Sequence, residues 1–168
     1  MREKFPNQQT GEPLHNWKLA EIEEKTDWLD NYQTVEQFMT RDLFTMRPED
    51  VIDLAVTLMN WKHIRHVPVE DADGKLVGII SHRDLLQFFS QNSQAGNPET
   101  AVRDIMRTNL ITIAPETKTL AALRLMRDKK IGCLPVVKGE KLVGLITDYD
   151  FLTVSTRLFE ERLKKQAK

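Results

Sequence analysis

A hydroxyl side chain stands three residues before an aspartate at two places in this sequence, as Ser81 with Asp84 and as Thr147 with Asp150. At the start of a helix, such an aspartate can accept hydrogen bonds from both hydroxyls of a ribose. The Ser or Thr and the free backbone N–H groups can then face a phosphate. The same spacing also makes a capping box, which only starts a helix. The sequence therefore offers two candidate sites for a ribose phosphate, each with a structural alternative.

Both motifs occupy equivalent positions in a duplicated segment. A shift of 66 residues superimposes Lys75–Leu86 on Lys141–Leu152. A shift of 67 residues does the same for the earlier part of each copy, where these residues meet identical partners: Val35, Met39, Leu43, Thr45, Pro48, Glu49, Ala55, Leu58, Met59, Lys62, Ile64, Pro68 and Val69. Two copies are too few for a solenoid, so we expect a pseudo-twofold pair whose halves bury each other's apolar faces.

Each copy carries the signals of one β-α-β-β-α unit, which predicts the α+β fold class. A short strand, at Phe44–Thr45 and Ile111–Thr112, runs into Pro48 or Pro115, whose polar and acidic neighbours suit a helix start. The following helix has one apolar face, made of Ala55, Leu58 and Met59 in the first copy and Ala122, Leu125 and Met126 in the second.

A hairpin and a second helix complete each unit. Asp73-Gly74 and Lys138-Gly139 are turn signals between two runs of strand type. These runs are Val67–Val69 with Leu76–Ile80 and Leu134–Val137 with Leu142–Ile146. The second helix opens directly after Ser81 or Thr147, which places each aspartate of the motif in its first turn.

The sequence divides into four parts. Residues 1–34 form an N-terminal arm and an amphipathic helix at Asn16–Tyr32, where apolar residues recur at helical spacing. Residues 35–91 are the first repeat, residues 92–101 are a polar linker, and residues 102–168 are the second repeat with a C-terminal helix.

Composition favours a soluble cytoplasmic module. The formal net charge of -1 argues against a nucleic-acid or membrane partner. Cys133 has no partner for an internal disulfide, and the sequence shows neither a signal segment nor a membrane span. It contains no phosphate-binding lysine loop, dinucleotide fingerprint, nucleophile elbow or zinc-protease motif, so we expect no enzyme and no catalytic cofactor.

Both copies resemble the CBS (cystathionine-β-synthase) domain, and together they resemble a CBS pair over about residues 35–157. The resemblance rests on the strings Leu-Val-Gly-Ile-Ile-Ser-His-Arg-Asp-Leu-Leu and Leu-Val-Gly-Leu-Ile-Thr-Asp-Tyr-Asp-Phe-Leu, each behind a His/Cys-apolar-Pro-Val strand. It implies a regulatory module that binds an adenine nucleotide (AMP first, then ADP or ATP) between the repeats and modulates an enzyme or transporter. The sequence leaves open whether a related ligand such as S-adenosylmethionine or NADH replaces the nucleotide.

In the family, each cleft combines the hydroxyl-x-x-Asp motif of one copy with the first strand and the segment before Pro-Val of the other. Carried over, the first site comprises Leu43, Phe44, Thr45, Ile64, Arg65, His66, Thr147, Tyr149 and Asp150. The second comprises Ser81, Arg83, Asp84, Leu110, Ile111, Thr112, Ile131, Gly132 and Cys133. We expect the first site to bind nucleotide better, because it brings the cation Arg65 and the titratable His66 near the phosphate.

Other interpretations accompany these. The pair could be a structural dimerisation or docking module that binds no nucleotide. Gly78 and Gly144 either let the backbone approach a ligand or relieve the strand. His63 and His66 lack further residues at metal-ligand spacing, so we expect no metal. Cys133 suits a small buried apolar residue. We also expect a homodimer, because the second helices are apolar on more than one side, at Leu85, Leu86, Phe88, Phe89, Phe151, Leu152 and Val154.

Overall fold

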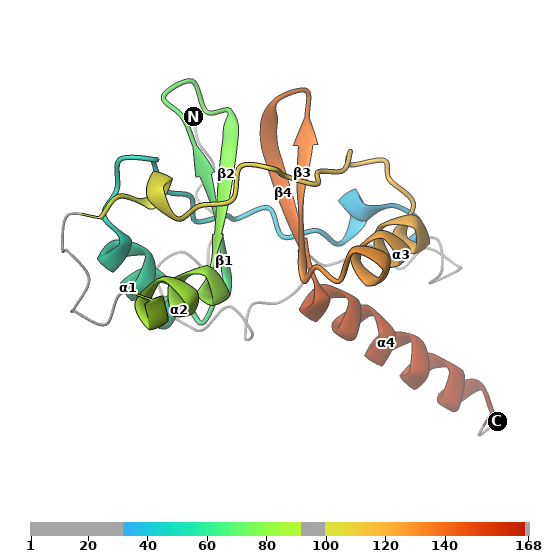
Figure 1. The fold of residues 1–168 in the computed structure, drawn as a ribbon. Helices are drawn as coiled ribbons and strands as arrows, with labels where there is room; N and C mark the ends of the chain where they lie inside the picture. Colours follow the sequence, from blue (N-terminus) through green and yellow to red (C-terminus); the bar gives the residue numbers. More distant parts are fainter. Residues whose placement is uncertain (1–31, 92–99, 167–168) are drawn as a thin grey trace, which may run out of the picture. The chain divides into compact units, whose positions relative to one another are not determined.

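The computed structural model describes residues 32–91 and 100–166, which fall into two compact units (Figure 1). Within these ranges, unit 1 comprises residues 45–70, 77–91 and 100–108. Unit 2 comprises residues 32–44, 71–76 and 109–166. The predicted N-terminal helix, apart from Tyr32, and most of the predicted linker lie outside the described residues. The mixed α and β class predicted from the sequence is confirmed.

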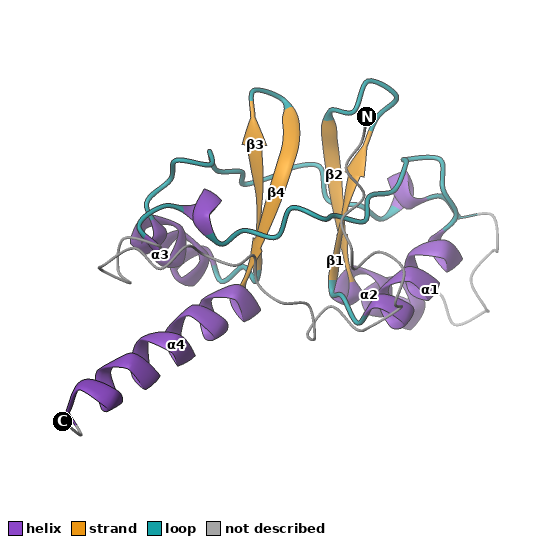
Figure 2. Ribbon diagram, turned by 180° about the vertical axis from the view of Figure 1, so that it is seen from behind, coloured by secondary structure: helices purple, strands orange, loops and turns teal. Residues whose placement is uncertain are grey.

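Unit 1 is built on a two-stranded sheet of β1 (His66–Glu70) and β2 (Leu76–Ser81). Its helices are α1 (Ile52–Lys62) and α2 (His82–Gln91), with a short 3-10 helix, η4 (Val102–Asp104). The α1 helix contacts both α2 and β1, as Figures 1 and 2 show from opposite sides. Their apolar faces enclose a core of Met46, Ile52, Ala55, Met59, Val67, Val69, Ile80, Leu85 and Val102.

Unit 2 repeats this plan with a longer last helix. The strands β3 (Cys133–Lys138) and β4 (Lys141–Thr147) pair antiparallel, with Cys133 opposite Thr147 and a bulge between Val136 and Val137. The helices are η3 (Val35–Gln37), α3 (Thr119–Lys129) and α4 (Asp148–Gln166). The core consists of Val35, Phe38, Met39, Ile113, Ala122, Met126, Leu134, Val136, Ile146, Phe151 and Val154.

The compact units differ in composition from the repeats in the sequence, because the first residues of each repeat pack with the remainder of the other. We call residues 32–44 and 100–108 the lead segments. Val35, from the first, is fully buried in the core of unit 2, and Val102, from the second, is fully buried in the core of unit 1. Each unit therefore combines residues from both repeats of the sequence.

The helices and hairpins follow the predicted pattern. Ala55 and Ala122 are fully buried, and Met59 and Met126 lie beside them in the two cores. The α2 and α4 helices begin directly after Ser81 and Thr147. Gly74 and Gly139 adopt φ values of 75° and 65°, a left-handed conformation that favours glycine and fits the predicted turns.

The start of each unit differs from the prediction. The strands expected at Phe44–Thr45 and Ile111–Thr112 are each reduced to one parallel bridge, which joins Met46 to Val69 and Ile113 to Val136. A turn begins at Pro48 or Pro115, which leaves no room for a longer ladder. The first helices accordingly begin beyond those prolines, after Val51 and Lys118, and neither of these residues makes a side-chain cap.

No helix in the described part of the chain combines the length and the apolar character that crossing a membrane requires.

Candidate functional site

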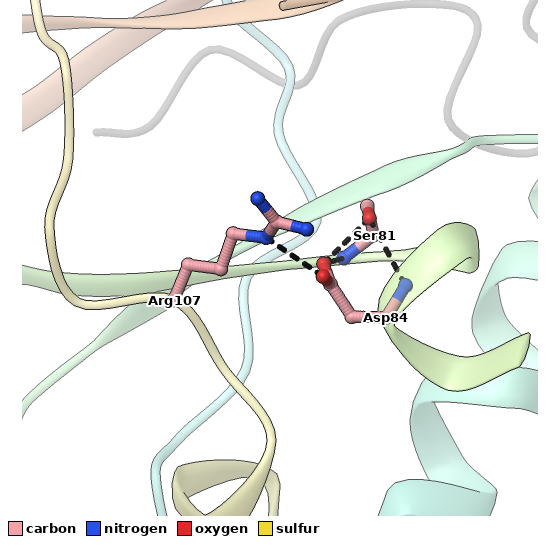
Figure 3. Close-up of polar contacts among 3 residues, drawn as sticks. All are labelled: Ser81, Asp84 and Arg107. Carbon is pink, nitrogen blue, oxygen red and sulfur yellow. Dashed lines mark hydrogen bonds and ion pairs between the residues drawn. The ribbon is translucent and has the colours of Figure 1, made fainter. Parts of the chain in front are cut away.

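The first hydroxyl-x-x-Asp motif lies where β2 passes into α2 in unit 1 (Figure 3). The backbone N–H and the hydroxyl of Ser81 donate to Asp84 Oδ2 at 2.9 and 2.5 Å. In return, the backbone N–H of Asp84 donates to Ser81 Oγ at 3.3 Å. These reciprocal bonds form a capping box, so the structural role considered for the motif is realised here.

Arg107 supplies a further partner to Asp84, from the lead segment at residues 100–108. Its Nε donates to Asp84 Oδ1 at 2.7 Å, as Figure 3 shows. The Asp84 side chain is 8% exposed and that of Arg107 is 60% exposed, so the guanidinium lies on the solvent side of a buried carboxylate. Two backbone hydrogen bonds with Ile79, of 2.8 and 3.0 Å, fix the register of Arg107 against β2.

The second motif lies where β4 passes into α4 in unit 2. The backbone N–H and the hydroxyl of Thr147 donate to Asp150 Oδ2 at 2.7 and 2.8 Å. The Thr40 hydroxyl also hydrogen-bonds to Asp150. Thr40 belongs to the lead segment at residues 32–44 and is fixed by two backbone hydrogen bonds with Leu145, of 3.0 and 2.9 Å.

Thr40 and Arg107 occupy the same position of the duplicated plan, and they give the two aspartates opposite electrostatic settings. At Asp84, burial acts to raise the pKa, but hydrogen bonds from Ser81 and Arg107 and the charge of Arg107 outweigh it, so the pKa lies below its usual value. At Asp150, burial is the stronger effect and raises the pKa, because Thr147 and Thr40 bring no positive charge.

Gly78 and Gly144 make room for a methionine of each lead segment. A Cβ atom at Gly78 would overlap Met106 Sδ, and one at Gly144 would overlap Met39 Sδ. Met39 and Met106 are themselves equivalent positions under the shift of 67 residues. The close approach at both glycines is therefore made by the protein's own side chain, which explains both residues as packing positions.

The segment before each first strand lies beside the motif of its own unit. The backbone N–H of His82 donates to the carbonyl of Arg65 at 3.0 Å. The equivalent bond in unit 2 runs from Asp148 to the carbonyl of Gly132 at 3.1 Å. These bonds tie the Pro-Val strand to the start of the following helix in both units.

The predicted site residues are distributed over both units. In the first predicted group, Thr45, Ile64, Arg65 and His66 belong to unit 1, and Leu43, Phe44, Thr147, Tyr149 and Asp150 belong to unit 2. In the second group, Ser81, Arg83 and Asp84 belong to unit 1, and Leu110, Ile111, Thr112, Ile131, Gly132 and Cys133 belong to unit 2. Each group therefore draws on both units, and its composition stays a prediction.

Several of these residues have clear surroundings within their own unit. Ile64 packs against the core of unit 1, and Ile111 and Ile131 pack against that of unit 2. Tyr149 lines an open depression along α4. Cys133 is buried, and burial, together with the negative charges of Asp150 and Asp148, raises the pKa of its thiol far above the usual range. Cys133 therefore packs as an apolar residue, as the sequence predicts.

Sequence reasoning missed Arg107 and Thr40. A signal was present, because the repeat alignment places these two residues opposite each other, directly after the identical Met39 and Met106. Where the two copies have identical neighbouring residues but differ at one position, the backbone is expected to be the same and only the side-chain chemistry changes.

Comparison with known proteins agrees with this architecture. The family model of the CBS domain matches residues 35–91 and 102–157. A CBS domain-containing protein of Dictyostelium discoideum is 33% identical over 135 residues, which cover 75% of this chain and 93% of that protein. The inosine-5'-monophosphate dehydrogenase of Methanocaldococcus jannaschii is 30% identical over 132 residues, which cover 78% of this chain but only 25% of the enzyme. The chain thus spans about a quarter of that relative.

Solved structures show the same fold. A Vibrio cholerae protein assigned to acetoin utilization (AcuB) matches with a TM-score of 0.73 and 40% identity, covering 78% of this chain and 97% of its own. CBSX2, solved in complex with AMP, matches with a TM-score of 0.67 and 28% identity, covering 75% and 98%. The CBS domain pair of the protein MJ0100, solved with 5'-methylthioadenosine and S-adenosyl-L-methionine, matches with a TM-score of 0.66 and 26% identity, covering 78% and 98%.

The family model covers most of the chain in two places, and these places carry the duplicated hydroxyl-x-x-Asp loops and the glycines that seat the lead segments. This chain belongs to the CBS domain family and contains two copies of the domain.

Proposed function

We propose that this chain is a regulatory module that binds adenosine-type ligands, with AMP the first candidate. Asp84 and Asp150 would accept hydrogen bonds from the two ribose hydroxyls. The observation that carries the proposal is that the carboxylate of Asp84 is buried, and that of Asp150 half-buried, at the start of a helix. An exposed aspartate completes a capping box equally well, whereas burying a carboxylate costs free energy, so a cap alone does not explain these positions.

The ligands bound in two of the similar solved structures support an adenosine ligand in particular. CBSX2 was solved with AMP, and the MJ0100 domain pair with 5'-methylthioadenosine and S-adenosyl-L-methionine. These three ligands share an adenosine group and differ in the charge beyond it. The adenosine moiety is therefore the recognised element in the proposal, and the group attached to it is the part that selects among ligands.

Of the two motifs, we propose that Asp150 is the better ribose acceptor. Asp84 already holds the guanidinium of Arg107, whereas Asp150 holds only neutral hydroxyl and backbone donors. Ribose hydroxyls can replace a neutral donor without breaking an ion pair. Arg65 and His66 stay the predicted phosphate contacts. The effect of Arg65→Ala on AMP affinity, measured once in a protein that lacks Asp84 and once in a protein that lacks Asp150, shows which motif Arg65 serves.

The regulatory part of the proposal follows from α4. Asp150 lies in the first turn of this helix of 19 residues, so a ligand held by Asp150 acts directly on α4. A ligand biases a partner only through its different affinity for two arrangements of the protein. We therefore expect AMP to change hydrogen exchange along α4. Protection confined to residues around Thr147 and Asp150 would instead describe a passive binder.

A thermal-shift panel tests ligand binding itself. A ligand that binds only the folded protein at a concentration of 100 times its Kd adds about 2.7 kcal/mol to the free energy of unfolding. We expect the melting temperature to rise with adenosine compounds and to stay unchanged with GMP at equal concentration. No response to AMP, ADP, ATP or S-adenosylmethionine at millimolar concentration would favour the alternative of a structural dimerisation module. Equal responses to AMP and GMP would remove adenosine as the recognised group.

A further inference from the structure

The position that distinguishes the two hydroxyl-x-x-Asp motifs is the residue that each lead segment places against the carboxylate. Arg107 bridges to Ile79 and Thr40 to Leu145, through paired backbone hydrogen bonds of 2.8 to 3.0 Å. Both residues contact the aspartate of the motif in the same unit. The backbone at this position is therefore the same in both units, and the side chain alone changes the charge at the motif.

A ribose that binds Asp84 must displace Arg107 from Oδ1 or share that oxygen with it. Arg107 is mostly exposed, so its guanidinium has room to leave, but a cation that loses its carboxylate requires a new anionic partner. A phosphate on the ligand provides that partner, and an uncharged nucleoside does not. A positively charged ligand would be repelled by the same guanidinium.

The Thr147–Asp150 motif has no such requirement. Thr40 contributes a hydroxyl, which can accept or donate a hydrogen bond and carries no charge. Ribose hydroxyls can take its place at Asp150 without leaving a cation unpaired. The negative charge of an ionised Asp150 also tolerates a ligand with a positive group.

We propose that Arg107 makes the Ser81–Asp84 site selective for anionic adenosine ligands, whereas Thr40 leaves the Thr147–Asp150 site open to uncharged or cationic ones as well. This inference rests on the proposed function. Arg107 is then a specificity-determining residue for a phosphate-bearing ligand. The Thr147–Asp150 site would accordingly accept the wider range of adenosine ligands, including AMP, adenosine, 5'-methylthioadenosine and S-adenosylmethionine, whereas the Ser81–Asp84 site would accept only phosphate-bearing ones such as AMP.

A reciprocal exchange tests this inference, with AMP and adenosine as probes in isothermal titration calorimetry. Asp150→Ala isolates the Ser81–Asp84 site, and Asp84→Ala isolates the other. In the Asp150→Ala protein, Arg107→Thr should reduce the preference for AMP over adenosine by roughly tenfold or more, the lower end for one charge-assisted hydrogen bond. In the Asp84→Ala protein, Thr40→Arg should increase that preference.

Two further variants keep the test interpretable. Arg103→Thr makes the same change of charge in the same lead segment, away from Asp84, and should leave the ratio of affinities unchanged. Arg107→Gln removes the charge but keeps a long side chain, and it replaces Arg107→Thr if the threonine variant does not fold. Raising the salt concentration should weaken the preference for AMP at the Ser81–Asp84 site more than at the Thr147–Asp150 site.

The possible failures are distinguishable. If Arg107→Thr or Arg107→Gln leaves the ratio of AMP to adenosine affinity unchanged while both ligands bind, the inference is wrong and the proposed function stands. Loss of all AMP binding in Asp150→Ala would also overturn the inference, because it requires an anionic ligand at Asp84. If wild-type protein binds no adenosine compound, the proposed function fails and the inference fails with it.

Discussion

Asp84 and Asp150 occupy the same position in the duplicated motif, but their pKa values are shifted in opposite directions. One neighbouring residue at each motif causes this difference. The pKa of Asp84 lies below its usual value, so ionised Asp84 stabilises the fold at neutral pH, and this contribution is lost as the pH falls through its folded pKa. The pKa of Asp150 is raised because its half-buried carboxylate is partly desolvated and Thr147 and Thr40 bring no positive charge. Protonated Asp150 favours the folded state, and this contribution is lost as the pH rises through its folded pKa.

Replacing each aspartate by asparagine should therefore change the melting temperature in opposite directions at pH 7. Asp84→Asn should lower it, because the ion pair with Arg107 and the charged acceptor of the capping box are lost. Asp150→Asn should raise it, because the buried charge is removed while an acceptor for the Thr147 N–H remains. Both differences should shrink as the pH falls and the wild-type side chains become protonated, and the difference for Asp84→Asn should persist to lower pH because the pKa of Asp84 is lowered and that of Asp150 raised. Destabilisation by both variants at pH 7 would contradict this assignment.

The lead segments are the elements on which both motifs depend. Each supplies a buried valine, a methionine against a glycine, and the residue that contacts the aspartate. Because Met39 fills the space above Gly144, the packing of this methionine holds Thr40 in register with Leu145. A substitution that disrupts the contact between Met39 and Gly144 should therefore disturb the Thr147–Asp150 motif as well as the core of unit 2.

Gly144→Ala should lower the free energy of unfolding by about 1 to 3 kcal/mol, the usual cost of overpacking a core. Urea denaturation measures this change. Met39→Ala should be less harmful in the Gly144→Ala protein than in the wild type, because the smaller side chain removes the overlap. Gly139→Ala serves as the control, because its cost comes from a φ of 65° with open space around it. Independent effects of Gly144→Ala and Met39→Ala would show that the contact is not the cause.

The sequence predicted an element correctly where the residues that determine it lie close together in the sequence. The starts of α2 and α4 were predicted correctly because Ser81 and Thr147 set them through residues three positions away. The first strands were predicted too long because an isolated bridge and a short strand have the same local signal. The placement of Val35 and Val102 could not be predicted from local patterns, because hydropathy marks a residue for burial without saying which core receives it.

At the scale of the whole molecule, the predicted dimer surface divides into two parts. Leu85, Phe151 and Val154 are buried in the cores of their own units, so they are not available to a partner. Leu86 and Leu152 are 65% and 60% exposed, and they stand near the starts of α2 and α4. Exposed leucines at equivalent places on both units are consistent with a symmetric interface, so a homodimer stays our proposal.

Light scattering at tens of micromolar should then give twice the monomer mass of 19.5 kDa. Combining Leu86→Glu with Leu152→Glu should shift the mass to that of the monomer, because charges would be buried at the interface. Leu120→Glu is the matched control, since Leu120 on α3 is also 65% exposed. A monomer mass for the wild-type protein, with and without AMP, would reject the dimer. Equal dissociation by Leu120→Glu would place the interface elsewhere.

The most direct test of the account is the affinity of AMP for Asp150→Ala, measured by calorimetry beside Asp148→Ala. Both variants remove one acidic side chain from the first turn of α4, but only Asp150 accepts the hydrogen bonds of Thr147. We predict that Asp150→Ala weakens the tighter binding event by about 1.5 to 3 kcal/mol, the range for hydrogen bonds to a charged group, and that Asp148→Ala leaves it nearly unchanged. An unchanged affinity in Asp150→Ala, or an equal loss in both variants, would contradict the assignment of this carboxylate to the ribose.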